Sequence, residues 1–83
     1  MEYSFQYDKK FTEDYQSLDK SVRVIIDKRI DKIKKQPELG KPLGRSCFVE
    51  KFDGWRITYI FYNDKIRFRG IKRRDKAYER GRG

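Results

Sequence analysis

The stretch KFDGWRITYIFYNDKIRFRG, residues 51–70, predicts three consecutive antiparallel strands. Asp53-Gly54 and Asn63-Asp64 each stand between two runs in which apolar and polar residues alternate. Gly, Asn and Asp accept the left-handed backbone that two-residue hairpin turns require. Alternation with a period of two is typical of a strand that has one buried face. The stretch therefore predicts two tight hairpins that share their middle strand.

Two-residue turns determine which residues lie opposite one another across the strands. The expected cross-strand pairs are Phe52–Trp55, Lys51–Arg56, Tyr62–Lys65, Ile60–Arg67 and Thr58–Arg69. Side chains of paired residues share a face, so one face is expected to hold the apolar residues Phe48, Phe52, Trp55, Ile57, Tyr59, Phe61, Ile66 and Phe68. Glu50 falls on this same face, and we expect it either at the sheet edge or beside a lysine of a helix.

The opposite face, which we call the outer face, is expected to carry only cations among its charged residues. They are Lys51, Arg56, Lys65, Arg67 and Arg69. Like charges directly opposite one another destabilise a sheet, and a face that served only solubility would mix its signs. The pattern therefore predicts an anion-binding surface. The alternatives are an ordinary solvated face, or a one-residue bulge that flips part of the pattern.

The first half of the chain predicts a strand and two helices. Residues 2–7 alternate in the manner of a strand, and Asp8 is a suitable N-cap for a short helix. Apolar residues at helical spacing follow, first Phe11, Tyr15 and Leu18, then Val22, Ile25 or Ile26, Ile30 and Ile33. The second helix is expected to begin after Ser17 or Asp19 and to end before Pro37.

Residues 37–45, PELGKPLGR, are expected to form a connection in which Leu39 and Leu43 anchor onto the core. The predicted fold is therefore α+β. An N-terminal strand, a two-helix hairpin and a three-stranded antiparallel meander form one twisted four-stranded sheet, with the helices on one face and a basic opposite face. Residues 1–83 are expected to be a single domain.

The composition of the chain indicates what kind of partner it binds and excludes several kinds of site. The 83 residues carry a formal net charge of +9, and residues 45–83 hold 12 basic and 5 acidic side chains. This asymmetry indicates a polyanionic partner, most simply nucleic acid. A single cysteine excludes an internal disulfide and fits a reducing cytoplasm. The absence of histidine excludes a zinc site, and there is no phosphate-binding glycine loop, apolar signal segment or membrane span. We expect no cofactor.

The last residues, IKRRDKAYERGRG, extend the basic surface. The third strand is expected to leave the sheet at Gly70, and the basic cluster up to Tyr78 is expected to fold back onto the outer face. Lys72 and Arg73 thereby join the strand cations as expected phosphate-binding residues, and Arg45 is expected to be a further one.

In order and spacing, these segments resemble the RelE/ParE superfamily of bacterial and archaeal toxins. The resemblance covers essentially the whole chain and is carried by ELGKPLGR, KFDGWRITYIF and IKRRDKAY. It implies a ribosome-dependent endoribonuclease that cleaves mRNA in the ribosomal A site without a metal, by attack of the ribose 2′-hydroxyl on the scissile phosphate. It also implies a cytoplasmic protein neutralised by a RelB-like antitoxin. The alternative that the resemblance allows is a ParE-like gyrase inhibitor or a catalytically inactive nucleic-acid-binding relative.

The resemblance also assigns roles to four residues. Lys51 matches a strand lysine that acts as general base or charge stabiliser, and Arg56 matches an arginine that holds the scissile phosphate. Arg74 matches an arginine that stabilises or protonates the leaving group, a role for which the adjacent Arg73 competes. Tyr78 matches a tyrosine that orients the mRNA or stacks on it. Some members have a second lysine two residues before the first, where this chain has Val49.

Overall fold

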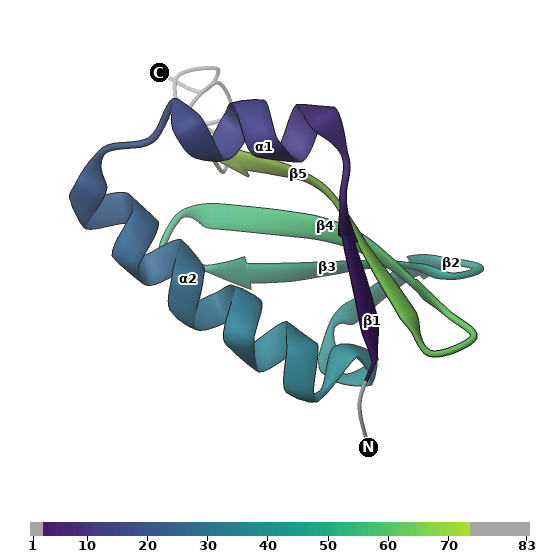
Figure 1. Cartoon of the computed structure of the whole chain (residues 1–83). Helices are drawn as coiled ribbons and strands as arrows, with labels where there is room; N and C mark the ends of the chain where they lie inside the picture. Colours follow the sequence, from purple (N-terminus) through teal and green to yellow (C-terminus); the bar gives the residue numbers. More distant parts are fainter. Residues whose placement is uncertain (1–2, 74–83) are drawn as a thin grey trace.

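In the computed structural model, which describes residues 3–73, two helices lie against one face of a mixed sheet (Figure 1). The helices are α1 (Lys9–Gln16) and α2 (Lys20–Lys35), followed by the short 3-10 helix η1 (Pro37–Leu39). The strands are β1 (Ser4–Tyr7), β2 (Lys41–Gly44), β3 (Cys47–Phe52), β4 (Trp55–Tyr62) and β5 (Lys65–Arg73). Neither helix of residues 3–73 has the length and apolar character of a membrane span.

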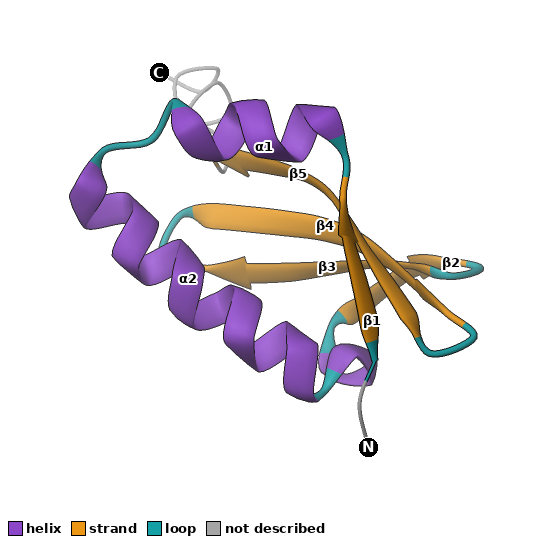
Figure 2. Cartoon of the chain, in the orientation of Figure 1, coloured by secondary structure: helices purple, strands orange, loops and turns teal. Residues whose placement is uncertain are grey.

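The sheet has five strands in the order β1-β5-β4-β3-β2, so the predicted number of four is wrong by one (Figure 2). β1 runs parallel to β5, and all other neighbours are antiparallel. The additional strand is β2, which lies in the segment predicted to be a connection. Proline and glycine are disfavoured inside strands but are tolerated at a sheet edge, and β2 is an edge strand that pairs only with β3. Leu39 and Leu43 are 57% and 58% exposed, so the prediction that they anchor this segment is wrong.

The core lies between the helices and the apolar face of the sheet, which we call the inner face. The α+β architecture and the inner face are both confirmed. The buried residues of the core are Phe11, Ile26, Ile30 and Ile33 from the helices and Phe52, Ile57, Tyr59, Ile66, Phe68 and Ile71 from the sheet. Phe48, Trp55 and Phe61 are partly buried against this cluster.

The segment after α2 is attached to the core by a buried hydroxyl. Tyr59 donates a hydrogen bond of 2.7 Å to the carbonyl oxygen of Pro37. Burial raises the pKa of Tyr59 to about 12, and the nearby Glu50 carboxylate adds to this shift. A Cβ atom at position 40 would collide with the Tyr59 hydroxyl, so Gly40 allows the chain to pass directly beside this hydroxyl.

The pairing of the two hairpins agrees with the prediction up to one point. Lys51 lies opposite Arg56, and Ile60 lies opposite Arg67, as expected. Thr58, however, is paired with Gly70 and not with Arg69, because the register shifts between Thr58 and Tyr59. Arg69 is therefore the extra residue of a β-bulge. The strand continues beyond the bulge to Arg73, so the predicted exit from the sheet at Gly70 is wrong.

Candidate nucleic-acid interface

Three cations from three adjacent strands lie in one line across the outer face. Lys51 of β3 is opposite Arg56 of β4, and Arg56 is opposite Lys72 of β5. We call these three residues the cation row. Cβ atoms of directly paired residues lie about 5 Å apart, so the row spans about 10 Å between its outer members.

The bulge at Arg69 is what brings Lys72 into the row. With uninterrupted pairing, Arg56 would face Ile71 and Lys72 would point toward the inner face. The bulge instead buries Ile71, which is 5% exposed, and leaves Lys72 exposed on the outer face. The sequence carries a signal for this shift, since the inward positions Phe68 and Ile71 are three residues apart where alternation would require two.

Arg56, at the centre of the row, is only partly exposed. Among the described residues, its Nε is the one buried side-chain nitrogen or oxygen without a hydrogen-bond partner. A guanidinium is a strong donor in a geometry that suits two oxygens of a phosphate. Since Arg56 also stands between two lysines, an anion at this position would both accept its hydrogen bonds and neutralise the row.

Arg67 and Arg69 belong to a second group, which contains an acid. Asp8, directly after β1, forms ion pairs with the Nε atoms of Arg67 at 2.6 Å and of Arg69 at 3.7 Å. The hydrogen bond to Asp8 raises the pKa of Arg67, and the charge of the carboxylate adds to the effect. The prediction that the outer face holds cations and no acid is therefore wrong. Asp8 was missed because only the parallel pairing of β1 with β5 places it there.

Three further predicted residues lie away from the cation row. Lys65 is at the opposite end of the β4–β5 hairpin, opposite Tyr62, and Arg45 is exposed in the turn before β3. Six residues of strand separate each from the row, which is about 20 Å. Arg73 lies on the other side of the sheet from Lys72, with its guanidinium 5.5 Å from the centre of the Trp55 ring. Arg74 and Tyr78 lie outside the described residues.

Glu50 lies on the inner face and forms ion pairs with two basic residues of α2. Its side chain is only 9% exposed, and Oε2 accepts bonds of 3.1 Å from both Arg29 and Lys32 of α2. Of the two expected placements, the one beside a helix lysine is confirmed. Arg29 also lies 4.9 Å above the ring of Phe52.

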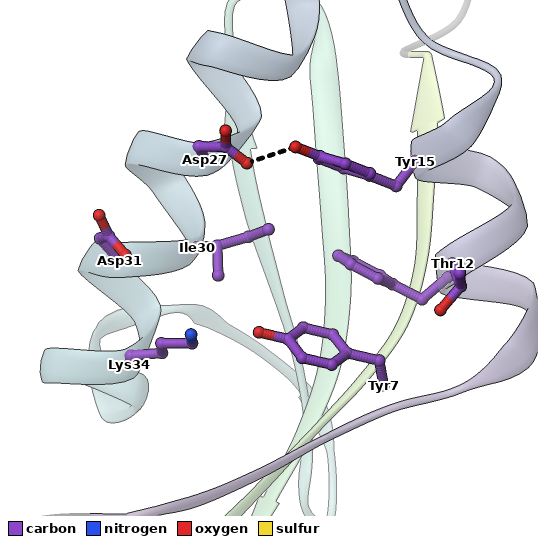
Figure 3. Close-up of a pocket in the computed structure, with 8 residues that line it drawn as sticks. Tyr7, Thr12, Tyr15, Asp27, Ile30, Asp31 and Lys34 are labelled. Carbon is purple, nitrogen blue, oxygen red and sulfur yellow. Dashed lines mark hydrogen bonds between the residues drawn. The ribbon is translucent and has the colours of Figure 1, made fainter.

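A groove of about 520 Å³ lies between α1 and α2, on the helical side of the molecule (Figure 3). Its lining combines aromatic rings with two carboxylates, those of Asp27 and Asp31. The Tyr15 hydroxyl donates a bond of 2.8 Å to Asp27, and this bond, together with burial, raises the pKa of Tyr15. With these two carboxylates against the single ammonium group of Lys34, the lining repels phosphate, so this groove is unsuited to nucleic acid. Within residues 3–73, no cluster of His, Cys, Asp or Glu is arranged to hold a metal ion.

The fold is that of the RelE toxins. The chain superposes on the isolated RelE toxin of Escherichia coli with a TM-score of 0.78 at 18% identity, over 95% of this chain and 94% of that one. Against the RelBE2 toxin–antitoxin complex of Mycobacterium tuberculosis, the TM-score is 0.76 at 16% identity, with coverages of 89% and 100%. For the RelE–RelB complex of Pyrococcus horikoshii, these values are 0.74, 18%, 92% and 99%.

Sequence comparison adds nothing to this likeness. No protein-family model matches the chain, and no curated protein matches it. The likeness is therefore one of architecture.

Proposed function

We propose that this protein is the toxin of a type II toxin–antitoxin pair and acts as a ribosome-dependent endoribonuclease on mRNA, without a metal ion. The observation that carries the proposal is the cation row, Lys51–Arg56–Lys72, on the outer face of a RelE-type fold. The RelE-type fold supports the class of protein. The row supports the chemistry, because it collects three basic side chains at one place where a phosphate can approach.

Cleavage begins when the ribose 2′-oxygen attacks the adjacent phosphorus and gives up its proton to a base, for which Lys51 is the candidate. The bond from phosphorus to the 5′-oxygen then breaks, leaving a 2′,3′-cyclic phosphate on one product and a 5′-hydroxyl on the other. The pentacoordinate phosphorane carries more negative charge than the starting diester. Fixed cations therefore stabilise it more than the ground state, which is the requirement for catalysis.

In this scheme, Arg56 binds the non-bridging oxygens of the scissile phosphate, and Lys72 neutralises the charge that develops beside it. Arg74 completes the reaction by stabilising or protonating the leaving oxygen, and Tyr78 orients the message. Stacking of an aromatic ring on an unpaired base contributes about 1–3 kcal/mol. The proposed partners are mRNA in the ribosome and a RelB-like antitoxin, and the proposed location is the cytoplasm.

The test is to add purified protein to translating ribosomes with a defined message and to map the 3′ ends of the fragments. We expect cleavage in the A site, and we expect the double variant Arg56→Gln, Lys72→Gln to be at least about 100-fold slower, the usual loss when charge stabilisation of a transition state is removed. Lys28→Gln, an exposed lysine of α2, is the matched control and should retain full activity. An intact message in the presence of the wild-type protein would refute the proposal.

One observation favours a second candidate, a nucleic-acid-binding relative that does not cleave. Val49, at the position where some RelE proteins have a second lysine, is only 1% exposed. This part of the outer face therefore contributes no charge. Salt-dependent RNA binding that needs Arg56 and Lys72, without any cleavage on the ribosome, would establish this candidate.

A further inference from the structure

The two basic groups of the outer face differ in the surroundings of their arginines. Arg56, at the centre of the cation row, has an Nε without a hydrogen-bond partner, whereas the Nε atoms of Arg67 and Arg69 both form ion pairs with Asp8. The line of residues between the two groups, Val49, Thr58 and Gly70, is uncharged. About 13 Å of strand separates them, which is close enough for one extended RNA strand to contact both.

The conformation of Asp8 shows that its carboxylate is committed to the arginines. Asp8 occupies the N-cap position of α1, where an aspartate ordinarily accepts a hydrogen bond from the first turn of the helix, yet its side chain makes no such bond. Its backbone N–H donates to the carbonyl oxygen of Phe68 at 2.9 Å, which extends the β1–β5 pairing by one residue and holds Asp8 beside both arginines. The carboxylate forms the 2.6 Å bond to Arg67 instead of capping the helix.

Stability does not account for this arrangement. The side chains of Arg67 and Arg69 are each 51% exposed, and ion pairs at such exposure contribute little to folding. The effect of Asp8 on a phosphate is larger, since a phosphate must displace the carboxylate from Arg67 and also approach its negative charge.

We propose that Asp8 is a specificity-determining residue that masks Arg67 and Arg69, and so confines phosphate binding on the outer face to the cation row. This inference rests on the proposal that the outer face binds RNA. Its consequence is that the protein holds a phosphate at the row and does not retain RNA along the whole basic face.

The test measures binding of a fluorescent, unstructured oligoribonucleotide by anisotropy at several salt concentrations. Asp8→Asn keeps a good N-cap and removes only the charge. If one or two arginines become available, we expect the affinity to rise roughly 5- to 25-fold at 0.1 M salt and the salt slope to steepen by about 0.7–1.4. Glu13→Gln, an exposed residue of α1, changes the net charge equally and should alter the affinity less than about twofold.

A second set of variants distinguishes the unmasking of Arg67 and Arg69 from the general effect of adding one positive charge. When Asp8→Asn is introduced into the variant Arg67→Gln, Arg69→Gln, the increase should disappear, because no masked cation remains. An increase of the same size in both backgrounds, or an Asp8→Asn effect no larger than that of Glu13→Gln, would overturn the inference. Failure of the proposed function is recognised separately, as RNA binding that is insensitive to Arg56→Gln and Lys72→Gln.

Discussion

Glu50 and Lys51 are neighbours on β3, and they lie in opposite electrostatic surroundings. Glu50 points to the inner face, where Arg29 and Lys32 both bind one of its oxygens. Lys51 points to the outer face and stands opposite another cation, Arg56. Where the charge is buried, the protein supplies its counterions. On the outer face, the cation row places like charges opposite one another across the strands, which costs stability and is explained by an anionic ligand.

From the contrast between Glu50 and Lys51, we expect the charges of the inner face to determine the stability of the fold and those of the outer face to determine RNA binding. The largest effect should follow from Glu50→Ala. It removes two charge-assisted bonds and leaves Arg29 and Lys32 without their acid, at a cost of about 3 kcal/mol in the free energy of unfolding. RNA affinity of the folded protein should be unchanged. Urea unfolding measures the loss, and Glu13→Ala is the control. Equal stability of the two variants would contradict the comparison.

Tyr59 gives the inner face a dependence on pH. Because its folded pKa, about 12, lies above the ordinary value of 10.0, the folded state holds the phenolic proton more tightly than the unfolded state. Its contribution is fully present below pH 10 and is lost as the pH rises toward 12. The difference amounts to roughly 2–3 kcal/mol.

This contribution is isolated by comparing wild type with Tyr59→Phe, since the other tyrosines and the lysines titrate in both. The unfolding free energy of the wild type should fall more steeply between pH 10 and pH 12 than that of the variant. Parallel curves over this interval would show that burial does not raise the pKa of the Tyr59 hydroxyl.

The smallest effect should have the opposite sign. Lys72→Gln relieves repulsion with Arg56 and should stabilise the fold by about 0.2–1 kcal/mol, while it weakens RNA binding. Lys28→Gln corrects for the general benefit of removing one charge from a chain with a net charge of +9. If Lys72→Gln destabilises the protein relative to this control, then the cation row is not a strained arrangement that favours an anion.

The helices, the hairpins and the composition of the inner face were predictable from residues near one another in the sequence. Two turn signals and the alternation around them predicted that Lys51 would lie opposite Arg56. Val22, Ile25 or Ile26, Ile30 and Ile33 similarly predicted the buried side of α2, on which Ile26, Ile30 and Ile33 are buried. Such patterns are informative because turn geometry and side-chain periodicity depend mainly on local backbone preferences.

Only the tertiary structure decided the features that shape the outer face. The bulge at Arg69 follows from the gain of burying Ile71, β2 forms because β3 offers it an edge, and Asp8 reaches the arginines because β1 pairs in parallel with β5. The parallel pairing joins segments far apart in the chain. The bulge and β2 depend on burial and on edge pairing, which turn signals do not specify. By itself, the sequence determined that this protein has a basic sheet face; packing decided that Lys72 joins the cation row while Arg67 and Arg69 are bound by an acid.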